Sequence, residues 1–232
     1  MRLVETRYAP GLRQPLHAHE QALIALVAGG EVAEENRPGG EARGGSGEIV
    51  VVPSRCPHEI VYGPRGAKLF TLELDEEVGP HRWQLGGAPS ALFVRAIDEW
   101  RAGGSIDGIV FDLVASVREG KSCIDAKAPA AQRMRDLARR FSSSDVTVAA
   151  AARELGMHPV ALARAFRRAL GCSITCYRRR AQLRHAASLL AESRMALADV
   201  ALEAGFADQS HFCRIFKREI GVSPSRYRAF AV

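Results

Sequence analysis

Three histidines in the N-terminal third of the sequence are spaced so that their imidazoles can converge on one ligand. His17 and His19 are one residue apart and therefore face the same side of a strand. His58 follows a second strand after a turn. Imidazole nitrogens bind zinc, iron and other divalent metals, and neutral imidazoles also hydrogen-bond organic ligands or fill structural roles. These three residues are the candidate effector-binding site, with a metal site as the weaker alternative.

A sequence repeat in the C-terminal half carries a second group of candidate residues, many of them basic. At an offset of 50, LARAFRRALGCSITCYR (162–178) aligns with FCRIFKREIGVSPSRYR (212–228), with seven identities in seventeen positions. Upstream, AAARELG (150–156) aligns with DVALEAG (199–205) at an offset of 49. Each copy is typical of a helix, a turn containing glycine and a second helix.

The residues around the first turn fit this interpretation. Thr147 is the expected N-cap of a short helix over Val148–Leu155. After the glycine turn, Pro159 suits the first position of the next helix. Two helix-turn-helix units are therefore predicted, at about 147–168 and about 197–218.

The second helix of each copy has one apolar face and one face of short or basic side chains. Positions spaced by four residues share a helix face. The predicted buried residues are Leu162, Phe166 and Leu170 in the first copy and Phe212, Phe216 and Ile220 in the second. The predicted outward residues are Val160, Ala163, Arg164 and Arg167 in the first copy and Gln209, Ser210, Cys213, Arg214 and Lys217 in the second.

Such helices are suited to the major groove of B-DNA, which admits one α-helix whose N-terminal residues reach the base edges. Two of them enter successive grooves about 34 Å apart if a stiff spacer separates them, and Tyr177–Ala191 is predicted to be that spacer helix. Residues 127–232 carry 19 Lys and Arg against 8 Asp and Glu, whereas residues 1–126 carry 13 against 18. The charge therefore favours double-stranded DNA as the partner, with an all-helical protein-binding repeat as the alternative.

The segment GFADQSHFCRIFKREIGVSPSRYR (205–228) closely resembles the signature of the AraC/XylS family of transcriptional regulators. The upstream copy is similar to the first helix-turn-helix of that family. The resemblance covers about residues 130–230 and implies bipartite DNA binding. Carried over position by position, it assigns base contacts to Val160, Ala163 and Arg164 in the first copy and to Gln209, Ser210, His211 and Arg214 in the second. Phosphate contacts are expected from Arg167, Arg168, Lys217 and Arg218.

The two copies differ in the readout that they offer. Arg164 and Arg214 can each pair bidentately with guanine. Val160, Ala161 and Ala163 offer few hydrogen bonds, so the first copy is expected to read thymine methyl groups and DNA shape. More of the polar readout is expected from the second copy.

The first 80 residues are typical of short β-strands separated by turns. PLHAHEQALIALVAGG (15–30) and GEIVVVPSRCPHEIVY (47–62) resemble the two motifs of the cupin-type sensory domain found in many AraC/XylS regulators. Metal cupins carry a glutamate a few residues beyond the histidine pair. This sequence has Leu23 and Ile24 there, and Glu20 is expected to point away. No cofactor is therefore expected, although a divalent metal remains the alternative.

The predicted fold class is α+β with two domains. A cupin-like β-barrel at 1–80 and a helical dimerisation or linker region at 81–126 precede an all-α tandem helix-turn-helix domain at 127–232, with a linker at Ser122–Pro129. Between about 90 and 120 the apolar residues follow helical spacing: Phe93, Ile97 and Trp100, then Ile109, Leu113 and Val117. These stripes cover the barrel or a second subunit, and a homodimer is expected.

Composition excludes several classes of protein. With 232 residues, 47% of them hydrophobic and 25% charged, the chain is neither collagen-like, disulfide-rich nor disordered. Its longest apolar run, Ala22–Ala28, is far shorter than the roughly 18 residues of a membrane-spanning helix, so no membrane partner is expected. The N-terminus lacks the pattern of a secretory signal and the five cysteines lack a framework spacing, which predicts a reduced, cytoplasmic protein.

Together these features predict a sequence-specific DNA-binding transcription regulator, controlled by a small-molecule effector in the N-terminal barrel. RNA polymerase is a further candidate partner, and no enzymatic activity is expected. One alternative is a constitutive DNA-binding regulator whose barrel only dimerises. A more remote alternative is a metal-dependent cupin enzyme.

Overall fold

The computed structural model describes residues 1–35, 41–85, 87–119, 134, 137, 141, 146–170 and 172–231. Contacts divide the chain into two compact units. The large unit combines Met1–Lys121 with Leu183–Val232, and the small unit is Ser122–Gln182. The whole of the linker predicted at Ser122–Pro129 lies outside the described residues, as do Gly171 and the side chain of Leu170.

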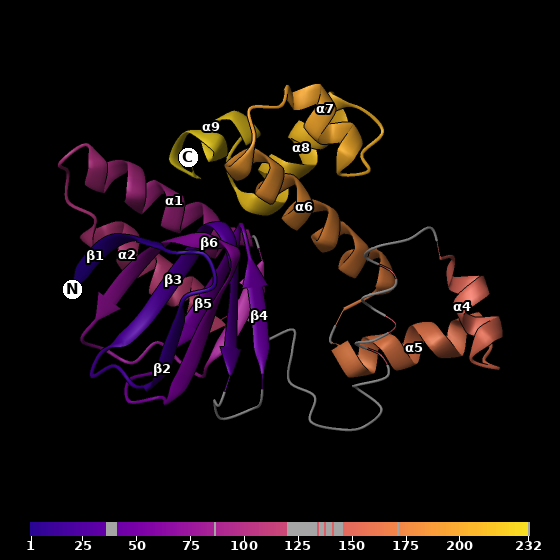
Figure 1. The fold of residues 1–232 in the computed structure, drawn as a ribbon, viewed down its shortest axis with the longest axis horizontal. Helices are drawn as coiled ribbons and strands as arrows, with labels where there is room; N and C mark the ends of the chain where they lie inside the picture. The colour runs from indigo at the N-terminus through magenta and orange to yellow at the C-terminus, as the bar shows by residue number, and fades with distance from the viewer. Residues whose placement is uncertain are drawn as a thin grey trace. The chain divides into compact units, whose positions relative to one another are not determined.

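The large unit begins with one antiparallel sheet of seven strands (Figure 1). Its central path runs β1-β6-β3-β5-β7, while β2 pairs with β6 and β4 pairs with β3. The strands are β1 (Arg2–Tyr8), β2 (Arg13–His17), β3 (Ala22–Glu35), β4 (Ala42–Gly45), β5 (Glu48–Val52), β6 (His58–Leu74) and β7 (Arg82–Leu85). Among the described residues the path ends at β1 and β7 and does not close. The expected closed barrel is therefore corrected to an open sheet, which also extends past the boundary predicted at residue 80.

Strand β3 is buried on both faces because it lies at the centre of the sheet. Its successive side chains alternate between two cores. Ile24 and Leu26 join the apolar core that faces the helices. Leu23 and Val27 join a second core on the opposite face, together with Trp83 and other residues of the sheet. Strand β3 therefore separates the two cores along much of its length.

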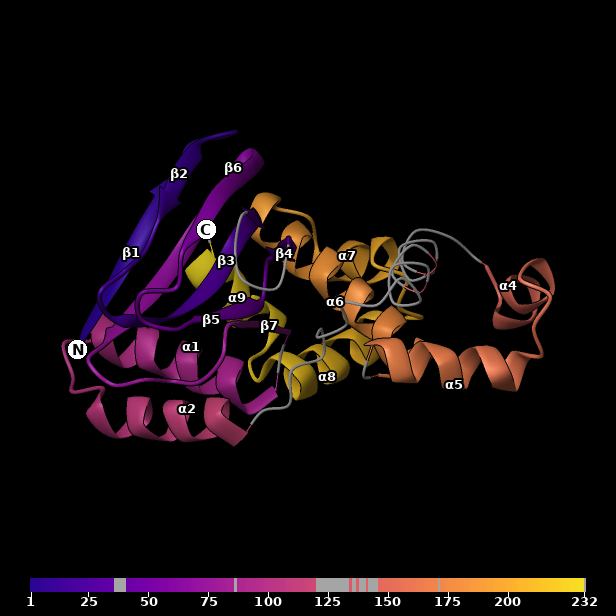
Figure 2. The ribbon, with the colours of Figure 1, turned by 90° about the horizontal axis from the view of Figure 1, so that it is seen from below.

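Helices α1 (Gly87–Arg101) and α2 (Asp107–Glu119) run side by side along the sheet (Figure 2). The apolar stripes predicted between 90 and 120 form the buried faces of these two helices: Phe93, Ile97, Leu113 and Val117 are fully buried and Ile109 is partly buried. Trp100 departs from the prediction, with 38% of its surface exposed. Both stripes therefore pack on the sheet of the same chain, while Phe111 on α2 is 74% exposed.

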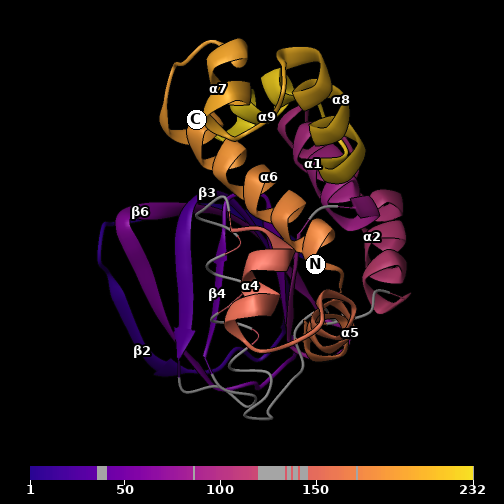
Figure 3. The same ribbon diagram turned by 90° about the vertical axis from the view of Figure 1, so that its right-hand side faces the viewer.

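The second helix-turn-helix lies in the same large unit as the sheet. It consists of α7 (Leu197–Glu203) and α8 (Gln209–Ile220), followed by α9 (Pro224–Ala231), and Figure 3 shows the three helices grouped together. Their apolar residues continue the core that contains the helix-facing side of the sheet. The sequence placed 127–232 in a domain of its own, whereas the contacts group 183–232 with the sheet.

The small unit contains the first helix-turn-helix, α4 (Val148–Glu154) and α5 (Pro159–Leu170). Its own core includes Phe141, Leu162 and Phe166. The Arg178 guanidinium lies 4.8 Å above the Phe141 ring and donates a hydrogen bond to the carbonyl of Val146. Helix α6 (Ile174–Glu192) confirms that Tyr177–Ala191 is helical, while its role as a spacer stays a prediction.

None of the helices in the described ranges is long and apolar enough to cross a membrane.

Candidate functional site

The first helix-turn-helix is shaped by the turn residues that its sequence predicts. Thr147 is the N-cap of α4, and its Oγ1 accepts a hydrogen bond of 3.1 Å from the backbone N–H of Ala150. Pro159 begins α5, where a missing N–H costs nothing. Between the helices, Gly156 has φ +61°, a backbone conformation that glycine adopts without steric cost. The predicted N-cap and helix start are confirmed.

Helix α5 buries one side and exposes the other. Leu162 and Phe166 are fully buried, as their spacing predicts. The four residues predicted to approach DNA are all exposed: Val160, Ala163, Arg164 and Arg167. Their contact with DNA remains a prediction, but α5 leaves this face open within the small unit.

In the second helix-turn-helix, α8 is capped at both ends. Asp208 is the N-cap of α8, and its Oδ1 accepts a hydrogen bond of 2.7 Å from the backbone N–H of His211. Gly221 ends the helix with φ +93°. The sequence analysis did not single out Asp208, although an aspartate just before a helix with an apolar stripe is a recognisable cap signal.

Helix α8 presents its outward residues in the same way as α5. Phe212, Phe216 and Ile220 are buried. Gln209, Ser210, Arg214 and Lys217 are exposed on the other side of the helix. Structurally equivalent arginines, Arg164 and Arg214, thus occupy exposed positions in both copies of the repeat.

His211, unlike the other α8 residues predicted to read bases, is partly buried. Its ring packs edge-on against Phe206, with the ring centres 5.8 Å apart. Among the described atoms its Nδ1 is buried without a hydrogen-bond partner. The side chain therefore packs against the turn between α7 and α8, so its predicted base contact depends on the Nε2 edge of the ring.

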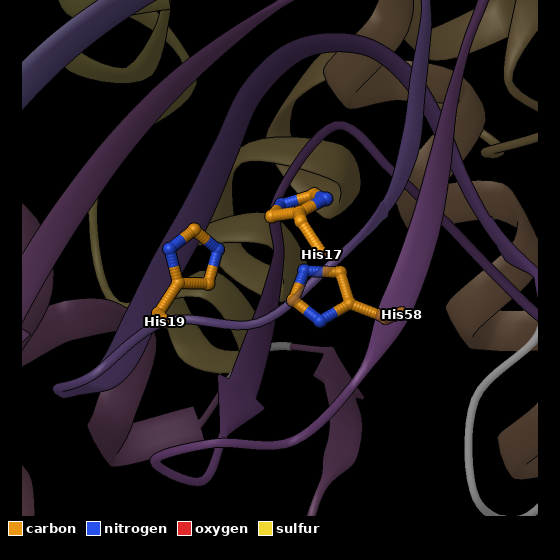
Figure 4. Close-up of side chains that lie close together, drawn as sticks. All are labelled: His17, His19 and His58. Carbon is orange, nitrogen blue, oxygen red and sulfur yellow. The ribbon is translucent and has the colours of Figure 1, made fainter.

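The three histidines of the N-terminal sheet do converge, as their spacing predicts (Figure 4). One ligand nitrogen from each of His17, His19 and His58 lies within 4.8 Å of the others. The ring centres are 4.6 Å apart for His17 and His58 and 4.9 Å apart for His17 and His19. His17 and His58 are directly opposite each other where β2 pairs with β6. The sheet therefore builds a cluster of three imidazoles from two neighbouring strands and the loop that follows β2.

Two of the rings are oriented by the backbone. The Nδ1 of His17 lies 2.8 Å from the carbonyl oxygen of Pro15, and the Nδ1 of His58 lies 2.9 Å from that of Cys56. A carbonyl oxygen only accepts, so each Nδ1 carries the proton that it donates. In the neutral rings Nε2 is then the unprotonated nitrogen that binds a ligand proton or a metal.

Burial favours the neutral form of two of these imidazoles, His19 and His58. Burial, together with the nearby His58 and His17, lowers the pKa of His19 to about 4. Burial also lowers the pKa of His58, although its hydrogen bond to the Cys56 carbonyl opposes this. Neutral imidazoles accept hydrogen bonds and coordinate metals, so the cluster is ready for either kind of ligand.

The donor set fits a divalent metal held by three nitrogens and completed by a ligand from outside the protein. Zinc–nitrogen bonds are about 2.0–2.1 Å long, so the rings would have to draw closer together around the ion. Glu20 does not supply the fourth ligand, because its exposed carboxylate lies 3.2 Å from the guanidinium of Arg55. Leu23 and Ile24 are buried apolar residues of β3. The chain itself thus offers three imidazoles, as the sequence indicates.

Because its pKa is lowered on folding, His19 makes stability depend on pH. The unfolded chain binds a proton at the ordinary pKa of 6.5, whereas the folded chain resists protonation down to about pH 4. Stability from this residue is therefore fully present above pH 6.5 and decreases as the pH falls from 6.5 towards 4. We expect His19→Gln to lose less stability than the wild type between pH 7 and pH 5, measured by urea unfolding. Equal losses in the two proteins would contradict the assignment.

Comparison with known proteins identifies the class to which the C-terminal region belongs. Residues 151–229 match a protein-family model described as a helix-turn-helix domain. The chain is 35% identical over 105 residues to the arabinose operon regulatory protein of Salmonella typhimurium, which covers 44% of this chain and 37% of that protein. It is 40% identical over 63 residues to the transcriptional activator RhaR of Escherichia coli, covering 27% of this chain and 22% of the activator. The chain thus matches less than two fifths of the length of these curated relatives.

Two solved structures were also found to be similar. The C-terminal domain of AraT, a response regulator from Geobacillus stearothermophilus, is 32% identical and covers 44% of this chain and 86% of its own, with a TM-score of 0.39. ToxT from Vibrio cholerae is 12% identical and covers 100% of this chain and 98% of its own, with a TM-score of 0.42.

The C-terminal region therefore matches a helix-turn-helix domain and is similar to the matching regions of these arabinose operon regulatory proteins. The curated relatives that share this region are named as an operon regulatory protein and a transcriptional activator.

Proposed function

We propose that this protein is a sequence-specific DNA-binding transcription regulator. The observation that carries the proposal is the exposure of equivalent faces on α5 and α8, within a region that matches the helix-turn-helix family. Each face combines small side chains near the start of the helix with arginine or lysine further along. That is the arrangement a helix needs to approach base edges and neutralise phosphates in the major groove.

Within this proposal the two helices read DNA in different ways. Arg164 and Arg214 pair with guanine, while the 52%-exposed Val160 and the neighbouring Ala163 contact thymine methyl groups. Gln209 and Ser210, with His211 through its Nε2 edge, supply the polar readout of α8. Arg167 and Lys217 contact phosphates, which positions the protein without specifying sequence.

The N-terminal sheet is proposed to sense a small molecule. His17, His19 and His58 bring three imidazoles together on the sheet, and we assign the effector to this cluster. The four free cysteines of the described residues agree with a reduced, cytoplasmic location. A homodimer and a contact with RNA polymerase complete the proposal, and both follow from the predicted class of regulator.

Selection from a random pool of double-stranded DNA tests DNA binding. Several rounds of enrichment on the purified protein should give one consensus site, which binds about 10³-fold or more tightly than scrambled DNA at physiological salt. Binding to both DNAs is then measured by fluorescence anisotropy. A pool that yields no consensus, or equal affinity for both sequences, would contradict the proposed function.

Native mass spectrometry of the purified full chain tests the sensing role. A mass increase of one divalent metal per chain that disappears in His58→Gln would make the cluster a metal site. A metal-free chain whose melting temperature rises with an organic ligand, but not in His58→Gln, would make it an organic-effector site. Any such ligand must also change the affinity for the selected DNA, because linkage is reciprocal. A chain that binds neither, and whose DNA affinity no ligand alters, would favour the constitutive alternative.

A further inference from the structure

Strand β3 carries an irregularity at the point where α6 and α9, the helices that flank the second helix-turn-helix, contact the sheet. Its pairing with β6 shifts register between Val27 and Gly29 and again between Gly30 and Val32. Gly30 has φ +81°, and a side chain there would collide with the carbonyl oxygen of Gly66 at 2.1 Å. We name residues 28–30 the β3 bulge. A bulge disrupts the regular pairing of the strand, and its glycines allow other elements to approach the backbone closely.

The residues of the β3 bulge lie against two helices of the C-terminal region, α6 and α9. The hydroxyl of Tyr227, on α9, donates a buried hydrogen bond of 2.9 Å to the carbonyl of Ala28. A Cβ atom at Gly29 would lie 3.3 Å from the Cβ of Ala191, on α6. Burial raises the pKa of the Glu192 carboxyl, also on α6, although the backbone of Gly30 opposes this. The fit therefore depends on a residue without a side chain at position 29.

Polar contacts beside the bulge strengthen this docking. The Nζ of Lys68, on β6, donates a hydrogen bond of 2.8 Å to the carbonyl of Phe230, near the end of α9. A cation at the C-terminus of a helix is favourable because the carbonyl dipoles point towards it. The same Lys68 lies 3.3 Å from Glu5 of β1 and is almost fully buried. Arg65 also forms an ion pair with Glu192.

The strands that form the bulge also lead to the histidine cluster. His58 begins β6, and that strand pairs with β3 from Glu59 opposite Glu35 to Tyr62 opposite Val32 before it reaches the bulge. Val27, next to the bulge, points into the core on the opposite face of the sheet from Tyr227. One short stretch of backbone thus lies between the histidine-bearing strand and the two helices, α6 and α9, that flank the second helix-turn-helix.

We propose that the β3 bulge couples the histidine cluster to the second helix-turn-helix. The bulge holds α6 and α9 against the sheet, and a change in the pairing of β6 with β3 alters that docking and hence the presentation of α8. The coupling to DNA rests on the proposed function, whereas the docking itself does not.

Hydrogen exchange on the full chain tests the docking without any DNA or ligand. Tyr227→Phe removes only the bond to Ala28, and Gly29→Val inserts a side chain against Ala191. In both variants we expect exchange in 186–231 to be about 5- to 100-fold faster, because a buried carbonyl loses its partner or the helices are displaced. Tyr177→Phe is the matched control, since Tyr177 is the repeat equivalent of Tyr227 and packs on Phe166 in the small unit. Unchanged exchange in 186–231, or equal acceleration in 148–170, would overturn the docking.

The coupling is tested by adding the selected DNA. In the wild type, bound DNA should slow exchange in residues 22–35 of β3 and in the first residues of β6, although neither segment contacts DNA. This protection should disappear in Tyr227→Phe. Protection that persists in the variant, or that is absent from the wild type, would overturn the coupling. Failure of the wild type to bind any DNA would instead overturn the proposed function and leave the docking result standing.

Discussion

Arg214→Ala should weaken binding to the selected DNA site by about 5- to 150-fold while changing binding to scrambled DNA much less. Arg214 is exposed on α8, one turn beyond Gln209 and Ser210, where a guanidinium can reach a guanine. A bidentate arginine–guanine pair contributes about 1–3 kcal/mol of discrimination, which corresponds to that loss. The change is measured by fluorescence anisotropy on both DNAs at one salt concentration.

Lys217→Ala is the matched control for this result. Lys217 is exposed on the same helix and is proposed to contact a phosphate. Its loss should lower the affinity for the selected and the scrambled DNA by a similar factor. It should also reduce the slope of log affinity against log salt concentration by about one unit. If Arg214→Ala also lowered the affinity for both DNAs equally, the assignment of Arg214 to a base contact would be wrong.

Phe216→Ala should destabilise the large unit by about 3–5 kcal/mol, the range for removing a buried aromatic side chain. Phe216 is fully buried, with its ring centre 5.4 Å from those of Phe212 and Tyr227. These residues share one apolar core with Phe70 and Leu72 of β6. Urea unfolding followed by hydrogen exchange should therefore show lost protection in the sheet as well as in α8.

Phe166→Ala provides the comparison, because Phe166 is the repeat equivalent of Phe216 and is equally buried. Its ring packs on Phe141 and Tyr177 within the small unit. We expect Phe166→Ala to cause a similar loss of stability that is confined to 148–178. Hydrogen exchange in β3 and β6 should stay unchanged. The same loss of sheet protection in both variants would contradict the division of the core into two units.

Elements that depend on local signals were predictable from the sequence. Thr147 and Pro159 mark helix starts through their own backbone and side-chain chemistry, and the structure has both at these positions. The outward and buried faces of α5 and α8 follow from helical periodicity alone. The convergence of the three histidines was also predicted, although His19 lies in the loop after β2 and not on the strand that its spacing from His17 predicted. His58 lies opposite His17 through the pairing of β2 with β6.

Features that depend on which surfaces meet were not predictable in the same way. Periodicity predicts that Phe212 and Phe216 face a core, but it does not say that this core includes the sheet. Sequence likeness to a barrel motif does not fix whether the edge strands β1 and β7 pair, and here they do not. The need for a small residue at Gly29 could not be predicted from the sequence either, because it depends on the close approach of Ala191 from a helix far away in the chain.

Hydroxyl-radical footprinting of the full chain on its selected site tests the central claim most directly. Two helices that enter successive major grooves should protect two segments on one face of the DNA, about 10–10.5 base pairs apart. Arg164→Ala should weaken protection of one segment and Arg214→Ala that of the other. A single protected segment, or loss of the same segment in both variants, would contradict DNA reading by two helix-turn-helix units.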